Sequence, residues 1–190
     1  MTTLKKIKIG TGVVLILIIA LFFHYNLPRT AVVQISGTDI KRMDNTKNIE
    51  KEKGNTDGRV KGEPQTTDVR YINSVSRKGK PMVFKNIDTG WGWPPYFKFD
   101  SANLTAEAQA FATDLNKPWV LVKYYGWRLT LFSMFPNALS LKQVDRNYTH
   151  IPLFNIVFLI LLFALIFVIR RKFKKIVAKI RDRNNSRREA

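Results

Sequence analysis

Two long apolar runs constrain this chain more than any other feature of its sequence. One covers residues 9–27 and reads IGTGVVLILIIALFFHYNL, and the other covers residues 151–169 and reads IPLFNIVFLILLFALIFVI. Neither run contains Asp, Glu, Lys or Arg. About 20 such residues in a helix cross the roughly 30 Å hydrocarbon core of a bilayer. The sequence therefore predicts two transmembrane helices, one near each end of the chain.

The first run also fits the apolar part of a secretory signal peptide, because lysines precede it. Signal-peptide cleavage requires small residues after the apolar core. Phe22, Phe23, His24 and Tyr25 occupy that place here. We therefore interpret the first run as an uncleaved anchor, and whether it is ever cleaved stays open at this point.

The positions of the basic residues predict the orientation in the membrane. Lys5, Lys6 and Lys8 precede the first run. A cluster of basic residues follows the second: Arg170, Arg171, Lys172, Lys174 and Lys175. Because Lys and Arg near span ends stay on the cytoplasmic side, both termini should be cytoplasmic, and residues 28–150 should form an extracytoplasmic domain.

In the basic tail, residues 170–190, the segment from Arg170 to Arg183 should continue as a helix from the second span. Basic residues in such a helix favour binding to anionic lipids of the inner leaflet. A solvated cluster that only sets orientation, or a tail that binds a protein partner, are the alternatives. The net charge of +18 does not indicate a nucleic-acid partner, because the folded domain is placed outside the cytoplasm.

Residues 28–150 show the pattern of a small, mainly β domain. β-prone runs cover residues 31–43, 69–76, 81–88, 119–125 and 137–144, and one helix precedes the fourth run. The resulting order β-β-β-α-β-β is that of the OB-fold, so we predict an OB-like barrel, with another five-stranded β-roll as the alternative. The polar stretch 43–68 has few apolar residues and predicts a mobile loop.

The helix of this domain is predicted from an apolar stripe. Leu104, Ala108, Phe111 and Leu115 recur at helical spacing. Ser101 or Asn103 is a suitable N-cap, and Asn116, Lys117 and Pro118 should end the helix.

Two aromatic segments are the candidate binding residues. Residues 89–99 carry Trp91, Trp93, Tyr96 and Phe97 around two glycines and two prolines. Such rings could stack on a sugar, a peptide or a base, could enter the lipid headgroup layer, or could plug the open end of a barrel, which is the interpretation we favour.

The second aromatic segment, residues 124–135, contains Trp127 and Arg128. Its arginine could stack on a tryptophan or pair with Asp88 or Asp100.

Catalytic and metal chemistry have little support in the sequence. The chain has no cysteine and only two histidines, His24 and His150. If the two apolar helices pair antiparallel, these histidines lie at similar depth, but two ligands make a poor metal site. No catalytic motif is present, so we expect no enzyme activity, no cofactor and no metal.

Several motifs resemble a known family. They are DVRYIN (68–73), GKPMVFKNID (79–88), TGWGWPPYFKFDS (89–101), YGWR (125–128) and FSMFPNAL (132–139). They resemble a bacterial family catalogued only as a domain of unknown function, which looks like small envelope proteins with an amino-terminal hydrophobic segment. The resemblance covers roughly residues 28–145 and implies a bacterial or phage origin and an inner-membrane location. It implies no activity and no catalytic residue.

The function that these patterns favour is that of a two-pass inner-membrane protein. Its periplasmic β domain would serve as an interaction or assembly module, with a protein partner or a second copy of the chain. One alternative is a glycan- or ligand-binding domain, even an enzymatic one, that uses the tryptophan-rich loop. Another is an accessory subunit of a transport or channel complex.

Overall fold

The computed structural model describes residues 3–44 and 66–186 of the chain. The chain divides into two compact units, Met1–Thr149 and His150–Ala190. In the described residues, the first unit contains two helices and a β-barrel, and the second contains one long helix.

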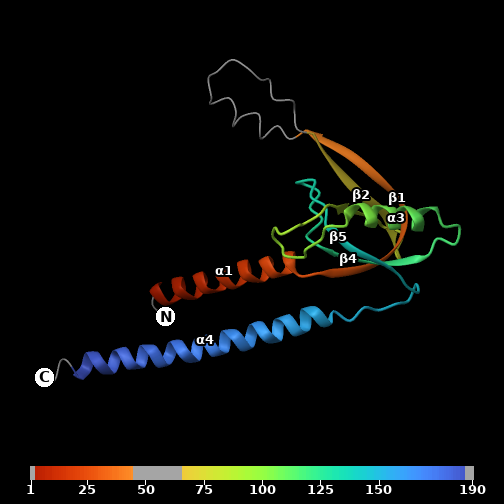
Figure 1. Cartoon of the computed structure of the whole chain (residues 1–190). Coiled ribbons are helices and arrows are strands. Elements are labelled where there is room, and N and C mark those ends of the chain that lie inside the picture. The colour runs from red at the N-terminus through yellow and green to blue at the C-terminus, as the bar shows by residue number, and fades with distance from the viewer. Residues whose placement is uncertain (1–2, 45–65, 187–190) are drawn as a thin grey trace, which may run out of the picture. The chain divides into compact units, whose positions relative to one another are not determined.

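The barrel consists of five strands and one helix (Figure 1). The elements of the first unit are α1 (Thr3–Asn26), β1 (Arg29–Asp44), β2 (Thr66–Ser76), β3 (Pro81–Asn86), α3 (Ser101–Thr113), β4 (Trp119–Tyr125) and β5 (Asn137–Gln143). The strands close in the order β1-β2-β3-β5-β4, and only the β3–β5 pair is parallel. The predicted order of strands and helix is confirmed.

β1 is long because it serves two neighbours. Arg29 to Gln34 pair with β4, and Val33 to Asp44 pair with β2. The register shifts between Ile35 and Gly37, as at a β-bulge, which bends a strand and lets it pass from one partner to the next.

Beyond this bend β1 and β2 continue as an arm, residues 37–44 and 66–73 (Figure 1). Arg70 to Asn73 of β2 also pair with β3, so only the outer end of the arm, residues 41–44 and 66–69, is two-stranded. The loop predicted at 43–68 is wrong at both ends, where residues 43–44 and 66–68 are strand. The remainder of that predicted loop lies outside the described residues.

The core of the barrel is formed by aliphatic side chains and one phenylalanine. Val33, Ile72, Phe84, Val120 and Val122 are fully buried. Alternate residues of a strand point to the same side, so these positions define the inner wall and their neighbours the outer wall. Burial of such side chains contributes about 1.5–3 kcal/mol each.

α3 packs on this core through only part of the predicted stripe. Leu104 and Ala108 are buried, and Phe111 packs against the cluster. Leu115 is 97% exposed, because the helix ends at Thr113 and Asp114 already has an extended backbone. The predicted helix end was therefore too late.

The start of α3 also differs from the expectation. Neither Ser101 nor Asn103 is the cap: the helix begins at Ser101. Asp88, at the end of the β3 region, accepts hydrogen bonds from the Ser101 backbone N–H (2.9 Å) and hydroxyl (2.7 Å). A carboxylate distant in sequence thus satisfies the first turn of this helix.

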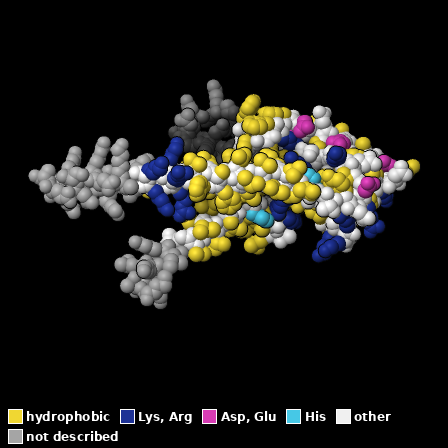
Figure 2. All heavy atoms as spheres, turned by 90° about the horizontal axis from the view of Figure 1, so that it is seen from below, with side chains coloured by type: hydrophobic (Ala, Val, Ile, Leu, Met, Phe, Trp, Pro, Cys, Tyr) yellow, Lys and Arg dark blue, Asp and Glu magenta, His cyan; other side chains and the backbone are white. Residues whose placement is uncertain are grey.

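The second unit is the helix α4 (Leu153–Ser186). Its part Leu153–Lys175 has a mean hydropathy of 2.8 and is long and apolar enough to cross a membrane. Figure 2 shows hydrophobic side chains on the surface of the apolar part of α4, and Lys and Arg side chains gather at the end of this part. The predicted helical continuation into the basic tail is confirmed. In α1, Gly10–Asn26 is a shorter apolar stretch, so a second membrane span stays a prediction.

Candidate functional site

The last turn of α1 is bonded to two loops of the barrel. The Trp loop, residues 89–98, joins β3 to α3, and the hairpin loop, residues 126–136, joins β4 to β5. The Tyr25 carbonyl accepts a hydrogen bond from the Gly126 N–H (3.0 Å), and the Asn26 carbonyl accepts one from the Tyr96 hydroxyl. The last carbonyls of a helix lack partners within the helix, so these loops complete its end.

Gly126 makes the first of these contacts possible. Its φ is +89°, which favours glycine, and the Tyr25 ring lies 3.7 Å from the position that a Cβ would take. A residue with a side chain at position 126 would therefore strain the backbone where it bonds the end of α1.

Two tryptophans bond side chains of the same helix turn. Trp93 Nε1 donates to Asn26 Oδ1 (2.9 Å), and Trp127 Nε1 donates to His24 Nδ1 (2.7 Å). The rings around this turn also contact one another, with centroid distances between 4.9 and 6.4 Å. We call this set the aromatic collar: Phe22, His24, Tyr25, Trp93, Tyr96, Tyr125 and Trp127.

Burial in the aromatic collar raises the pKa of two of its tyrosines. Burial and the neighbouring Tyr125 raise the pKa of Tyr96 to about 12. Burial also raises the pKa of Tyr125, against the effect of its hydrogen bond with Asn137. Both hydroxyls therefore remain neutral hydrogen-bonding groups at physiological pH.

The Trp loop is closed at its base by Lys98. The Lys98 carbonyl accepts from the N–H groups of Thr89 (3.1 Å) and Gly90 (3.0 Å), and the Lys98 N–H donates to the Thr89 hydroxyl (3.1 Å). The loop therefore projects as a closed unit rather than as an open connection.

The side chain of Lys98 enters the barrel, where the residue is only 5% exposed. Its ammonium donates to Asn86 Oδ1 (2.5 Å) and to the Ala138 carbonyl (2.6 Å). Burial lowers the pKa of Lys98 to about 8, although Asp88 and Asp100 act in the opposite direction. Lys98, which sequence reasoning missed, thus ties the Trp loop to β3 and β5.

The plug interpretation of the tryptophans is wrong. Trp91 is 85% exposed and Trp93 is 69% exposed, whereas Lys98 lies inside the barrel. Trp91 contacts Phe97 and Phe99 edge to face, at 5.4 and 5.8 Å, and these two rings are themselves exposed. The structure thus places a small exposed aromatic cluster on the Trp loop, whose Trp93 and Tyr96 contact the end of α1.

Arg128 makes neither of the two contacts that the sequence suggested. Its guanidinium lies 4.0 Å from the ring centroid of Phe135, not over a tryptophan, and it donates to the Met134 carbonyl (2.9 Å). Asp88 instead bonds Ser101. Arg128 therefore stiffens the hairpin loop, at whose tip Leu131 and Phe132 are exposed.

A pocket of about 330 Å³ lies on the outer wall of the barrel, next to the end of α1. We call it the outer-wall pocket. Each of four strands contributes one outward residue to it: Tyr71, Lys85, Tyr125 and Asn137. Tyr25 of α1 and Phe135 of the hairpin loop complete the wall. Sequence reasoning missed Tyr71, Lys85 and Asn137, although alternation along the strands could have grouped them.

Of the two histidines considered from the sequence, His24 has a defined partner in the first unit. His24 Nδ1 accepts a hydrogen bond from Trp127, so this nitrogen is occupied, and His150 belongs to the second unit. In the described part of the chain, no group of three or more His, Cys, Asp or Glu is placed to hold a metal ion.

Comparison with known proteins gives a family but no activity. The sequence profile of a family described as "Protein of unknown function (DUF1523)" matches residues 4–176. The chain belongs to this family. The expected resemblance to a family of unknown function is confirmed, and the match extends through both apolar helices and the basic cluster, beyond residues 28–145.

A relative from Haemophilus influenzae, described as an uncharacterized protein, is 44% identical over 126 residues. The alignment covers 66% of this chain and 67% of the relative. No solved structure matches the chain.

Proposed function

We propose that this member of the family is a two-pass protein of the bacterial inner membrane. It holds the barrel at the periplasmic surface, as an interaction or assembly module. The observation that carries the proposal is the joint between α1 and the barrel. Hydrogen bonds from both loops reach its last turn, while the apolar side chains of its preceding turns, such as Leu15, Ile16 and Leu17, are exposed.

An apolar surface on all sides of a helix requires lipid or protein around it. The stretch Gly10–Asn26 extends about 25 Å, near the lower limit for a membrane span. In α4 the apolar part Leu153–Lys175 ends in a basic cluster. Both features support membrane anchoring with cytoplasmic termini.

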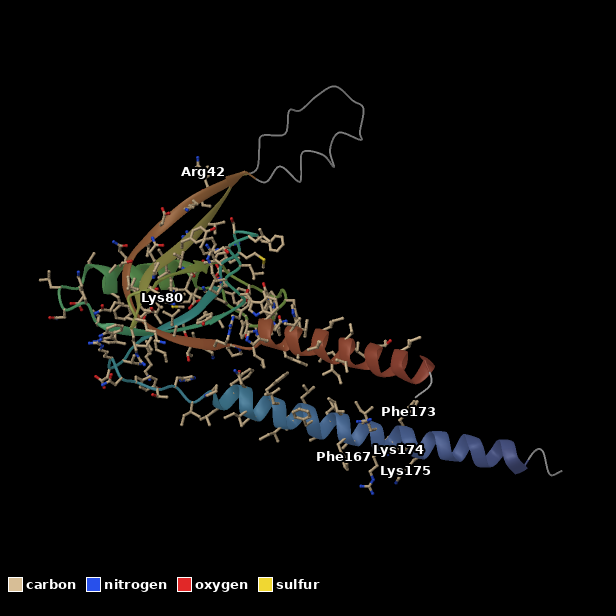
Figure 3. All side chains as sticks on the ribbon, turned by 180° about the vertical axis from the view of Figure 1, so that it is seen from behind. Arg42, Lys80, Phe167, Phe173, Lys174 and Lys175 are labelled. Atoms are coloured by element: carbon tan, nitrogen blue, oxygen red, sulfur yellow. The ribbon has the colours of Figure 1, made fainter. Side chains whose placement is uncertain are left out.

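The arm supports the assignment as an interaction module. In the part of the chain described, β1 pairs beyond Gln34 only with β2, so one backbone edge of the arm lacks a strand neighbour. Ile40 on this arm is 58% exposed, and Arg42 lies near its outer end (Figure 3). Free strand edges are common sites at which a partner adds a strand.

A second candidate function is the binding of an envelope glycan or another ligand. The exposed cluster of Trp91, Phe97 and Phe99 favours it, because flat aromatic faces stack on sugar rings. The Trp loop that carries this cluster contacts the end of an apolar helix, so lipid contact is the competing use of these rings.

Photo-crosslinking from single positions in living cells tests the proposal. A photoreactive amino acid at Ile40 should capture a protein, and one at Trp91 should capture lipid. A chain released from membranes by alkaline carbonate would contradict membrane anchoring. Lipid adducts alone at Ile40 would contradict the interaction module, and glycan adducts at Trp91 would favour the second candidate.

A further inference from the structure

The outer-wall pocket is bordered by cations on aromatic rings. Lys41 Nζ lies 5.7 Å from the ring centroid of Tyr71, and the Arg128 guanidinium lies 4.0 Å from that of Phe135. The two rings meet edge to face at 5.3 Å. Lys85 adds a third cation to the wall of the pocket itself. These positive groups come from β1, β3 and the hairpin loop, so only the folded barrel brings them together.

One carboxylate opposes these cations. Asp39 is the register partner of Tyr71, and with burial it raises the pKa of that phenol. Among the described residues, these contacts bring three cations and one carboxylate to the border. Such a balance favours an anionic group, and Lys is a common point-charge partner of phosphate.

The position of the pocket indicates that its ligand is amphiphilic. Tyr25, in the last turn of α1, forms part of the wall, and the hairpin loop that closes the pocket exposes Leu131 and Phe132. A polar group held beside Lys85 thus leaves apolar surface within reach of its remaining part. A volume of about 330 Å³ admits a headgroup rather than a whole lipid.

We propose that the outer-wall pocket binds the phosphate-bearing headgroup of an anionic phospholipid from the leaflet that α1 enters. The phosphate lies at Lys85, the glycerol contacts the rings of Tyr71 and Phe135, and the acyl chains follow the apolar surface of α1. This inference rests on the membrane anchoring proposed above.

Native mass spectrometry of the full chain in detergent micelles tests the proposal. The probes are dihexanoyl phosphatidylglycerol, dihexanoyl phosphatidylcholine and free glycerol phosphate. The wild type should bind one phosphatidylglycerol saturably and more tightly than phosphatidylcholine. Lys85→Gln should weaken this binding about fivefold, the change expected for one basic residue at an anionic surface, and Lys85→Arg should retain most of it.

Lys80→Gln is the matched control. Lys80 directly precedes β3, so it lies about 16 Å along the strand from Lys85 and should not change binding. Equal losses in the two glutamine variants would show general charge attraction and overturn the proposal. Equal binding of phosphatidylcholine would also overturn it.

Two further results separate the ligand source and the anchoring. Free glycerol phosphate that binds as tightly as phosphatidylglycerol would assign the pocket to a soluble phosphate and overturn the lipid assignment. Lys85→Gln should remain in carbonate-washed membranes with an unchanged unfolding temperature. A result that overturns lipid binding in the pocket therefore leaves the proposed anchoring intact, whereas a wild-type chain released into the soluble fraction would contradict the anchoring itself.

Discussion

Lys98 connects the exposed Trp loop to the interior of the barrel. A buried ammonium is stable only with hydrogen-bond acceptors around it, and Asn86 Oδ1 and the Ala138 carbonyl provide them. Asn86 in turn donates to the Ser101 carbonyl and the Thr105 hydroxyl at the start of α3. One cation therefore holds β3, β5, α3 and the Trp loop together, and its protonation affects all of them.

The stability of the barrel should rise with pH above about 8. The pKa of Lys98 is lowered from 10.5 to about 8, so between these values the unfolded chain binds more protons than the folded chain. The rise should be at most about 3 kcal/mol. Above about pH 10 it should reverse, because the raised pKa of Tyr96 keeps a proton that the unfolded chain loses.

Urea unfolding of the detergent-solubilised chain between pH 7 and 11, followed by tryptophan fluorescence, measures this profile. Lys98→Met should remove the rise above pH 8 whatever its effect at pH 7, and Lys80→Met should keep it. A wild-type profile that is flat between pH 8 and 10 would mean that Lys98 is not desolvated as described.

Among the elements, α1 depends on the barrel for its last turn. Trp93 and Trp127 donate to its side chains, and Gly126 donates to its backbone. Replacing both tryptophans by phenylalanine keeps an aromatic ring at each position but removes two N–H donors, each worth about 1 kcal/mol. The exchange of the Gly126 amide should then accelerate on the order of tenfold.

Hydrogen exchange with mass spectrometry on peptides around residue 126 measures this change. Trp91→Phe is the control, because Trp91 is exposed and contacts rings of its own loop. Equal exchange in the double variant and the control would show that the aromatic collar does not hold the helix.

α3 depends on Asp88 in a similar way. Asp88→Ala removes both acceptors of Ser101 and leaves the first turn of the helix without them. The free energy of unfolding should fall by about 1–2 kcal/mol. Asp88→Asn should lower the free energy of unfolding by less. Glu107→Ala, on the exposed side of the same helix, is the control and should leave this free energy nearly unchanged in the same urea titration.

At the scale of the whole molecule, the two apolar helices and their basic flanks predict the topology. Reporter fusions before residue 9 and after residue 175 should be cytoplasmic, and fusions between residues 28 and 150 should be periplasmic. Replacing Lys5, Lys6 and Lys8 by glutamate should weaken this preference at the first helix. A cytoplasmic reporter in the barrel of the wild type would overturn the two-pass arrangement.

The barrel could be predicted from the sequence because its strands and turns are locally encoded. The runs at 69–76 and 119–125 have β-prone residues between clear turn signals, and they form strands within a few residues of the expected bounds. Burial could not be read in the same way. Lys98 stands between two phenylalanines and looks like a surface charge, while Trp91 looks like a core residue, yet their positions are reversed.

Only part of the candidate site could be predicted from the sequence, because its contacts join distant segments. The tryptophans and Arg128 are conspicuous in the sequence, but their partners His24, Asn26 and Phe135 depend on how distant segments meet. Tertiary contacts of this kind leave no local periodicity from which they could be predicted.

β1 begins three residues after α1 ends and runs without interruption into the arm. Under the proposed anchoring, a partner that pulls on β1 would therefore load a strand that leads directly to α1. The proposed membrane helix and the arm are thus two ends of one continuous segment of chain.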